Sequence, residues 1–319
     1  MKFPLGNQTL RIGILGMTEG NGHPYSWSAM FNGYDPAEMA KCPFPVIPDY
    51  LNKQPKDTLG IPGARITCIC CTGYADREEA ERIARAALIP EVLDDPTEMI
   101  GRVDAVIVAT DDGNEHVERC RPFVEAGIPM FIDKPLVNTE EDLRTFVKWR
   151  REGAKFITSS CMRFCKEFEP YYQNRYEIGE LMYVCSTMAK KYENYGIHAL
   201  EAMYPLLGQG FVSVRNTGTY ERTVVHIKHE SGCNVNVIQG IGMMGVGMIL
   251  LGNKGTLNLS CKDSYYAFKK QLDLFVHWLR TGEEPFPFEE SVELMKLVIG
   301  GLRSREEGGR EVFLDEIQV

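Results

Sequence analysis

The sequence predicts two domains, an α/β domain on a doubly wound parallel sheet and then an α+β domain with an open, mainly antiparallel sheet. In the first half, apolar runs of strand length alternate with amphipathic helical stretches, which is typical of parallel strands joined by right-handed crossovers. After about residue 160, strand-like segments follow one another directly, several with alternating polar and apolar residues. We therefore expect domains over residues 1–160 and 161–319.

Each element of the first half has its own pattern. Strands are predicted at 11–16, 64–70, 104–110, 129–133 and 155–160, and helices from near Ser26 and over 76–88, 116–127 and 139–153. Residues 33–63 interrupt the alternation with a proline-rich, loop-like insertion to which the sequence assigns no role.

The second half contains mainly strands and ends in helices. Strands are predicted at 181–189, 211–218, 223–230, 233–243 and 256–261, helices at 265–282 and 288–304, and a last short segment at 311–317.

Composition excludes several classes of function. A net charge of −9 and a pI near 5.3 argue against nucleic-acid or anionic-membrane partners. No stretch approaches the roughly 20 apolar residues of a membrane span, and the N-terminus is unlike a secretory signal, so we expect a soluble, cytoplasmic protein. The ten cysteines lack the paired, turn-borne spacing of zinc ligands, and Cys161 and Cys165 have no CxxC partner. We predict buried thiols and no metal.

A glycine-rich turn follows the first strand. In RIGILGMTEGNGH, Gly16, Gly20 and Gly22 allow the backbone to approach a pyrophosphate, which the next helix N-terminus can bind. The spacing is longer than G-x-G-x-x-G, and Glu19 would repel a phosphate unless it points away. The turn predicts a Rossmann-type dinucleotide site binding NAD or NADP.

The end of the second predicted strand bears on the choice of cofactor. An NAD site usually has an acid there for the ribose hydroxyls. Here Thr72 occupies that region, and the first acid is Asp76, followed by Arg77. This pattern favours binding of NADP, with the alternative that Arg77 is only the solvated start of a helix.

Three segments resemble the glucose–fructose oxidoreductase, inositol dehydrogenase and MocA (Gfo/Idh/MocA) family. They are DAVIVATDDGNEHVERCRPFVEAGIPMFIDKPLV, GELMYVCSTMA and FVHWLRTGEEPFPFEESVELMKLVIGGLRSREEGGREVFL, in the family's order. The resemblance implies an NAD(P)-dependent oxidoreductase acting on the CH–OH group of a sugar, polyol or sugar derivative. It also implies a homo-oligomer, a dimer or tetramer, assembled through the sheet of the second domain.

The family's catalytic lysine corresponds to Lys134, in FIDKPLV. The resemblance implies that its ammonium donates a hydrogen bond to the substrate oxygen. The alternative is a charged strand end, but ligands of parallel sheets bind at the carboxyl ends of strands.

The family also has an acid followed four residues later by a histidine. In YENYGIHALEAMYPLLG the histidine is His198, and Asn194 holds the place of the acid. Asparagine cannot ionise, so the proton would pass through His198, assisted by Glu201 or Tyr192. The alternative is a capped helix start with a satisfied histidine.

The remaining predicted site residues lie at strand ends or beside these motifs. Thr110 and Asp111 end the strand where the family often has Thr-Pro-Asn, and Arg163 contacts either substrate or an interdomain partner. The predicted cofactor-binding residues are Gly16, Thr18, Gly20, Gly22, Thr72, Arg77, Thr110, Asp111, His116 and Asp133. The predicted substrate-binding residues are Arg163, Tyr192, Asn194 and Glu201. His23 lies near the turn without an assigned role.

Two other functions remain open. Glu19, the Asp111–Asp112 pair and Asn194 favour a non-catalytic, dinucleotide-sensing regulatory protein of the same fold. The third possibility is a glycosidase that oxidises its substrate transiently with tightly bound NAD. The sequence leaves the substrate and the direction of reaction undetermined.

Overall fold

The computed structural model describes residues 3–319 and divides into two compact units. The first contains the described residues through Asp133, with Lys148–Thr158 and Phe268–Pro285, and the second contains Lys134–Val147, Ser159–Ala267 and Phe286–Val319. The division therefore differs from the predicted single boundary at residue 160. Residues 134–147 precede that boundary but belong to the second unit, and residues 268–285 follow it but belong to the first unit.

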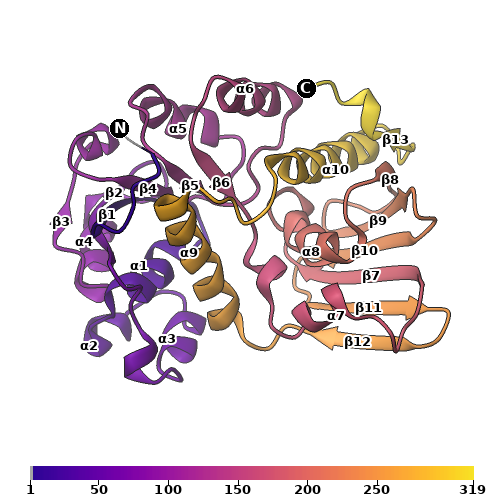
Figure 1. Ribbon diagram of the computed structural model, residues 1–319, viewed down its shortest axis with the longest axis horizontal. Helices are drawn as coiled ribbons and strands as arrows, with labels where there is room; N and C mark the ends of the chain where they lie inside the picture. The colour runs from indigo at the N-terminus through magenta and orange to yellow at the C-terminus, as the bar shows by residue number, and fades with distance from the viewer. Residues whose placement is uncertain (1–2) are drawn as a thin grey trace. The chain divides into compact units, whose positions relative to one another are not determined.

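The first unit is built on a six-stranded sheet (Figure 1). Its strands are β1 (Leu10–Gly16), β2 (Ala64–Cys71), β3 (Glu91–Val92), β4 (Ala105–Val108), β5 (Met130–Ile132) and β6 (Phe156–Thr158). They are all parallel, in the order β3-β2-β1-β4-β5-β6. This order confirms the predicted doubly wound fold, and the direction of winding reverses between β1 and β4, where such sheets bind ligands.

Helices join these strands. They are α1 (His23–Asn32), α2 (Pro36–Met39), α3 (Val46–Leu51), η1 (Lys56–Thr58), α4 (Arg77–Ala86), η2 (Pro96–Met99), α5 (His116–Glu125) and α6 (Glu140–Arg151). A further helix, α9 (Ser264–Thr281), comes from the second half of the sequence, and both α6 and α9 are divided between the units. Asp76 caps α4 by accepting a hydrogen bond from the Glu79 N–H, as expected of an acid at this position.

The segment 33–63 is not the loop that the sequence predicts, since it contains α2, α3 and η1. Asp35 caps α2 and Pro36 occupies its first turn, a combination that starts a helix even within a proline-rich segment. The segment packs on α1, where the Tyr50 hydroxyl donates to Ser26 Oγ at 2.5 Å. A side chain at Gly22 would collide with Ile47, so the segment also covers the turn after β1.

An ion pair joins the first strand to the start of β4. Asp104 accepts hydrogen bonds from the Arg11 backbone N–H at 2.8 Å, from Nε at 3.2 Å and from Nη2 at 3.0 Å. Burial acts to raise the pKa of the Asp104 carboxyl, but the Arg11 hydrogen bonds and charge outweigh it and hold the pKa below its ordinary value.

We predict that Asp104→Asn lowers the free energy of unfolding by about 1–2 kcal/mol at pH 7, a figure discounted because half of the Arg11 side chain is exposed. The carboxylate contributes stability above the unfolded-state pKa of about 4, and this contribution is lost as pH falls through the lower folded-state pKa. Urea unfolding of both proteins should therefore show a difference at pH 7 that shrinks toward pH 3. A constant difference across that range would contradict the assignment.

The second unit is built on a seven-stranded sheet. Its strands are β7 (Leu181–Ala189), β8 (Phe211–Asn216), β9 (Arg222–His229), β10 (Asn234–Gly240), β11 (Gly247–Gly252), β12 (Thr256–Ser260) and β13 (Val312–Phe313), in the order β12-β11-β7-β10-β9-β8-β13. The β7–β10 pair is parallel and the other pairs are antiparallel, which confirms the prediction of a mainly antiparallel sheet. The sequence pattern misses β11, because glycines and methionines precede it without a polar alternation.

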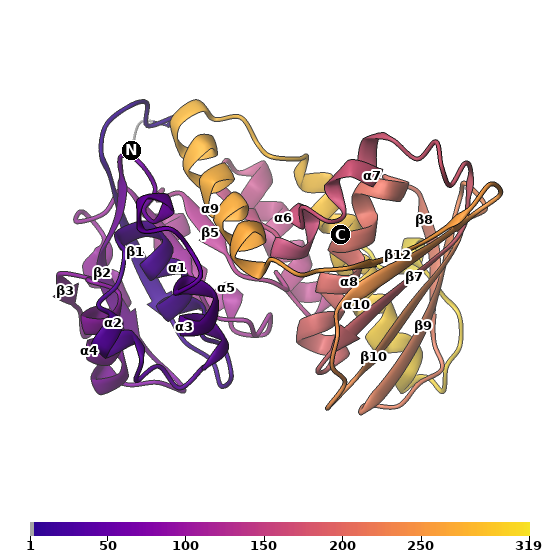
Figure 2. The ribbon, with the colours of Figure 1, turned by 90° about the horizontal axis from the view of Figure 1, so that it is seen from below.

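Helices cover one face of this sheet. The helices of the unit are η3 (Cys161–Phe164), α7 (Glu169–Gln173), α8 (Tyr192–Leu207), α10 (Phe288–Glu306) and η4 (Leu314–Glu316). Two of them, α8 and α10, pack on the same face of the strands (Figure 2). The buried rows of β9 and β10, with Val225, Ile227, Val235 and Val237, lie at 0% exposure.

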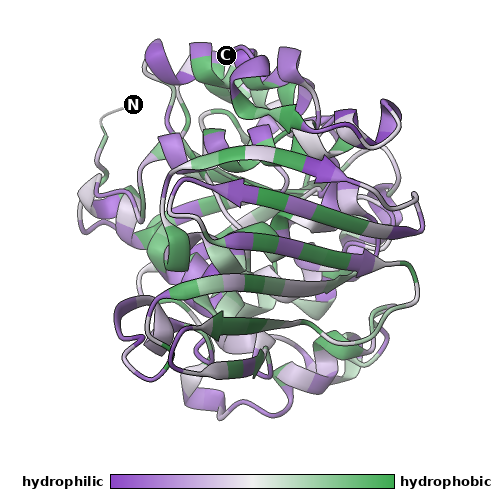
Figure 3. Cartoon of the chain, turned by 90° about the vertical axis from the view of Figure 1, so that its right-hand side faces the viewer, coloured by the Kyte–Doolittle hydropathy of each residue, from purple (hydrophilic) through white to green (hydrophobic). Residues whose placement is uncertain are grey.

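The other face of the sheet retains exposed apolar side chains. Tyr183, Val224, Ile238 and Leu251 are each at least 36% exposed, and the strand register aligns Val224 with Ile238 and Tyr183 with Leu251. Figure 3 shows apolar and polar bands interleaved across this face. Such a patch on a sheet is typical of an interaction surface.

Among residues 3–319, no helix has both the length and the apolar character that crossing a membrane requires.

Candidate functional site

The turn after β1 is tied to the end of β4. Thr18 Oγ1 donates to Asp111 Oδ1 at 2.5 Å, and the Asp111 N–H donates back to Thr18 Oγ1 at 3.2 Å. Glu19 in the same turn is exposed. Asp111 is therefore held by the Thr18 hydroxyl.

A second cluster joins the same turn to the end of β5. Asp133, at 0% exposure, accepts a hydrogen bond from Asn21 Nδ2 at 3.1 Å, and its Oδ2 lies 2.5 Å from His23 Nδ1. The His23 ring stacks on Trp27 with the ring centroids 4.2 Å apart. A carboxylate on Nδ1 fixes the proton there and leaves Nε2 for another partner. The sequence suggested His23 without a role and missed Asn21.

The glycines of the turn serve two purposes. Gly20 has φ +75°, a conformation that side chains disfavour, and an added Cβ would meet no atom within 4 Å. At Gly16 an added Cβ would lie 2.7 Å from Pro24 Cγ. Gly16 and Gly22 are therefore required by packing against α1 and α3, and only Gly20 leaves open space beside the backbone.

The end of β4 carries an unsatisfied polar atom. Thr110 is fully buried, and its Oγ1 has no hydrogen-bond partner within residues 3–319. Its carbonyl lies 2.9 Å from His116 Nε2, so His116 supports the strand end from within the protein. An orphaned hydroxyl at the carboxyl edge of this sheet fits the binding of a polar ligand such as a dinucleotide.

In the region expected to contact the adenosine ribose, Arg119 lies beside Thr72, and the predicted Arg77 pairs with other residues. Arg77 pairs with Glu81 at 3.1 Å and also with Asp94. Arg119, on α5, donates to Thr72 Oγ1 at 2.8 Å and to the Thr72 carbonyl at 3.3 Å. The sequence missed Arg119 because 47 residues separate it from Thr72.

Lys134, in the second unit, is not the solvated strand end of the alternative interpretation. It is 2% exposed, and its Nζ lies 4.4 Å from the centroid of the Tyr195 ring. The same ring meets His198 edge to face at 4.7 Å, and the Tyr195 hydroxyl accepts a hydrogen bond from Lys190 Nζ at 2.6 Å. The structure therefore brings the two predicted catalytic residues to one tyrosine, which the sequence missed although it lies one helical turn before His198 on α8.

A serine orients the histidine. Ser160 Oγ accepts a hydrogen bond from the Met162 N–H at 3.0 Å and lies 2.6 Å from His198 Nδ1. Because the Ser160 oxygen can accept a second hydrogen, it suits the tautomer in which the neutral ring carries its proton on Nδ1 and Nε2 is the proton acceptor. His198 is 7% exposed, which suits a group that exchanges a proton within a shielded site.

Arg163 and Glu201 form a buried ionic cluster. Arg163 Nε pairs with Glu201 Oε2, Arg163 Nη1 lies 2.6 Å from Glu290 Oε2, and the Ser160 N–H donates to Glu201 Oε1 at 3.2 Å. Burial raises the pKa of the Glu201 carboxyl, while the Arg163 charge and the Ser160 N–H act against that rise. Both residues thus hold η3 and α8 together around Ser160, which is a supporting position rather than the predicted contact with substrate.

Tyr192 and Asn194 are both predicted to bind substrate, but they lie in different surroundings. Tyr192 is at 0% exposure and donates to the Leu297 carbonyl at 3.1 Å, with its ring against Gly196 and Gly301. The structure corrects its assignment to the substrate, because the phenol belongs to the core between α8 and α10. Asn194 is partly exposed, and its Oδ1 has no hydrogen-bond partner in the described part of the chain, which suits a group that binds a hydroxyl.

Comparison with known proteins identifies related sequences for part of the chain. Residues 49–159 match the family GFO_IDH_MocA, described as an oxidoreductase family with an NAD-binding Rossmann fold. A segment of 119 residues is 34% identical to inositol 2-dehydrogenase 1 of Saccharopolyspora erythraea, covering 36% of this chain and 33% of that protein. The chain therefore aligns with about a third of the length of this curated relative.

Solved structures resemble the whole chain in fold. A probable dehydrogenase from Thermotoga maritima superposes with a TM-score of 0.75 over 97% of this chain and 100% of its own, at 17% identity. The scyllo-inositol dehydrogenase of Lactobacillus casei with bound NAD(H) and scyllo-inositol gives a TM-score of 0.73 over 97% and 100%, at 14% identity. At these identities the likeness shows a shared fold.

Proposed function

Through residues 49–159 the chain belongs to the Gfo/Idh/MocA family of oxidoreductases with an NAD-binding Rossmann fold, and on this premise we propose that it is an NAD(P)-dependent oxidoreductase of a sugar or polyol. The observation that carries the proposal is the buried Lys134 ammonium, which contacts the same tyrosine ring as His198. A lysine and a histidine on one aromatic ring provide a hydrogen-bond donor and a proton-transfer group for one hydroxyl.

A cyclic polyol of the inositol type is the substrate class that the relatives support. The curated relative is an inositol 2-dehydrogenase, and one structural neighbour holds scyllo-inositol together with NAD(H). Such a ring presents several neighbouring hydroxyls, and Asn194 offers an amide whose oxygen lacks a hydrogen-bond partner within residues 3–319. An amide both donates and accepts, so it can bind an adjacent hydroxyl without taking its proton.

The protein residues have distinct tasks in this reaction. A bound nicotinamide dinucleotide accepts or supplies the hydride. The Lys134 ammonium donates a hydrogen bond to the reacting oxygen and stabilises its negative charge. His198 takes or returns the hydroxyl proton at Nε2, since Ser160 engages Nδ1. Both groups contact the Tyr195 ring, whose hydroxyl accepts a hydrogen bond from Lys190.

The residues at the strand ends of the first unit would hold the dinucleotide. The open backbone at Gly20, the Thr18–Asp111 pair and the orphaned Thr110 hydroxyl support this assignment. Thr72 in place of an acid favours acceptance of a 2′-phosphate and hence NADP, and the Arg119 guanidinium beside it is already paired with Glu115. The family description favours NAD.

Fluorescence titration with NADH and NADPH tests the proposal directly. We expect saturable binding of at least one dinucleotide, equal in wild type and Lys134→Met, followed by Lys134-dependent oxidation of an inositol or a related polyol. Absence of binding by folded protein would overturn the proposal.

A dinucleotide-sensing protein without turnover is the second candidate, and the observation that favours it is Asn194 in the place of the family's acid. The Thr18–Asp111 hydrogen bond weakens the support drawn from the Asp111–Asp112 pair, because Asp111 already has a partner within the protein. Tight dinucleotide binding, with no turnover on any polyol or sugar, would select it.

We also propose that the exposed face of the second sheet pairs with a second copy of the chain. Its two exposed apolar pairs, Tyr183 with Leu251 and Val224 with Ile238, support a homo-oligomeric interface. Light scattering should give a dimer or tetramer for the wild type and a smaller species for Ile238→Lys. A monomeric wild type would refute the interface.

A further inference from the structure

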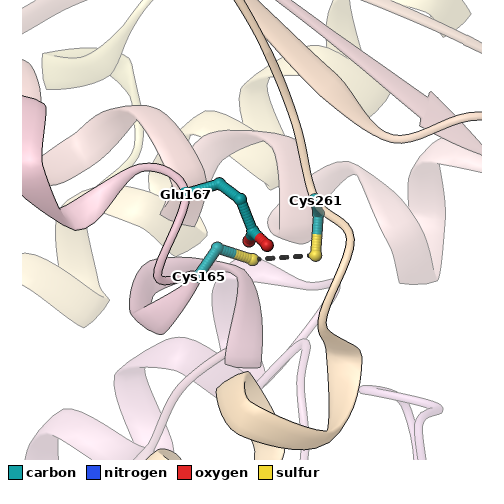
Figure 4. Close-up of side chains that lie close together, drawn as sticks. All are labelled: Cys165, Glu167 and Cys261. Atoms are coloured by element: carbon teal, nitrogen blue, oxygen red, sulfur yellow. Dashed lines mark hydrogen bonds between the residues drawn. The ribbon is translucent and has the colours of Figure 1, made fainter. Parts of the chain in front are cut away.

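Two cysteines far apart in the sequence lie in direct contact in the second unit. Cys165 follows η3 and Cys261 follows β12, and the Cys165 S–H donates to Cys261 Sγ with the sulfurs 3.0 Å apart. Figure 4 shows the Glu167 carboxylate directed toward both sulfurs, and the donor atoms of the three residues lie within 4.8 Å of one another.

Cys261 differs from the buried thiols Cys120 and Cys233. Cys120 and Cys233 are buried, and burial raises the pKa of both thiols, which keeps them protonated and inert. Cys261 is partly exposed, and the hydrogen bond from Cys165 lowers the pKa of its thiol against the opposing effects of burial and Glu167. Cys165 itself is at 0% exposure. One sulfur is therefore accessible and activated, and the other is shielded behind it.

We propose that Cys261 and Cys165 form an oxidation site for hydroperoxides, with Cys261 as the reacting thiol and Cys165 as the resolving thiol. None of Cys165, Glu167 and Cys261 is among the dinucleotide or substrate residues described above.

The chemistry balances in two steps. The Cys261 thiolate attacks the terminal peroxide oxygen, the O–O bond breaks, and Cys261 becomes a sulfenic acid as the peroxide leaves as hydroxide or alkoxide, which is then protonated. The Cys165 sulfur then attacks the Cys261 sulfur, an S–S bond forms, and the sulfenic hydroxyl leaves with the Cys165 proton as water. In sum, two thiols and one hydrogen peroxide give one disulfide and two waters.

Glu167 is positioned to transfer a proton in the second step. Its Oε2 is buried and has no hydrogen-bond partner among residues 3–319. A carboxylate so placed can take the proton from Cys165 and pass it to the leaving hydroxyl.

The same geometry disfavours a metal. Two thiolates on one zinc ion, each about 2.3 Å from it in tetrahedral geometry, stand about 3.7 Å apart. The sulfurs here are 3.0 Å apart and need to approach further, rather than separate, to form a bond. The absence of a metal therefore remains our prediction for this cluster.

The disulfide would connect the start of the second unit's longest segment to its end. Cys165 and Cys261 are 96 positions apart, within Ser159–Ala267. Closing so long a loop restricts the unfolded chain and raises the melting temperature.

The experiment combines oxidation with thiol counting. The reduced protein is treated with hydrogen peroxide, alkylated and examined by peptide mass spectrometry, beside Cys165→Ser, Cys261→Ser and the control Cys233→Ser. We expect the wild type and the control to lose two thiols to one Cys165–Cys261 disulfide, with a higher melting temperature, both reversed by dithiothreitol. In Cys165→Ser a dimedone-reactive sulfenic acid should persist on Cys261, while Cys261→Ser should form neither product.

Three outcomes would overturn the proposal. They are retention of both thiols in wild-type protein under peroxide, a disulfide between other cysteines, and stoichiometric zinc in the purified protein that is lost from both serine variants. Because none of these readouts uses dinucleotide or substrate, failure here leaves the proposed oxidoreductase function untouched, and the converse also holds.

Discussion

Replacing Lys134 with methionine is expected to lower kcat by about 10³-fold while changing dinucleotide affinity by less than about twofold. The ammonium is buried and stands 4.4 Å from the Tyr195 ring, where water cannot replace its hydrogen bond to the reacting oxygen. Methionine keeps most of the length of the side chain and removes only the charge and its donors. Steady-state kinetics on the polyol found by screening, together with dinucleotide titration, would measure both quantities.

A neighbouring lysine provides the matched control. Lys191 is exposed, and its ammonium packs on Tyr220 rather than on Tyr195. Lys191→Met should therefore retain wild-type kcat. Equal losses in the two variants would mean that general positive charge, and not the position of Lys134, supports the reaction.

The second large effect is on stability. Arg163→Met should lower the free energy of unfolding by about 3–5 kcal/mol, because it leaves the Glu201 carboxylate buried without its cation. Arg163 is 6% exposed and Glu201 is 2% exposed, so solvent cannot substitute for the lost partner. Urea unfolding at pH 7 measures the loss.

A double variant separates the ion pair from simple packing. Arg163→Met with Glu201→Leu removes both charges from the buried cluster, and Glu290, whose side chain is 26% exposed, can turn to solvent. We expect the double variant to be more stable than Arg163→Met alone. If the double variant loses as much free energy of unfolding as the two single variants lose together, the two charges contribute to stability independently, and the ion-pair assignment is wrong.

The architecture of the first unit was largely predictable from local pattern. Apolar runs such as 104–110 and 129–133, separated by helical stretches, predict parallel strands without knowledge of their partners, and the structure confirms them as β4 and β5. The family resemblance is confirmed over residues 49–159, which include the first of its three segments. The pattern failed where a segment is short or glycine-rich, as in β3 and β11, because two to six residues carry too little periodicity.

The candidate site was predictable only where one motif carries the chemistry. Lys134 and His198 each lie in a recognisable local sequence, whereas Ser160, Tyr195 and Arg119 act through partners distant in the chain or on another element. Tyr192 shows the opposite error, since proximity in sequence to His198 suggested a shared pocket and the helix turned its side chain into the core.

By itself the sequence determined the class of fold, the family match of residues 49–159 and the residues that can exchange a proton or donate to an oxygen, because periodicity and residue chemistry are local properties. Only the tertiary structure decided which of them meet. Lys134 and Tyr195 are 61 positions apart, as their numbers show, and Cys165 and Cys261 are 96 apart. Contacts of that kind depend on strand order and on how α8 packs on its sheet, which no local pattern specifies.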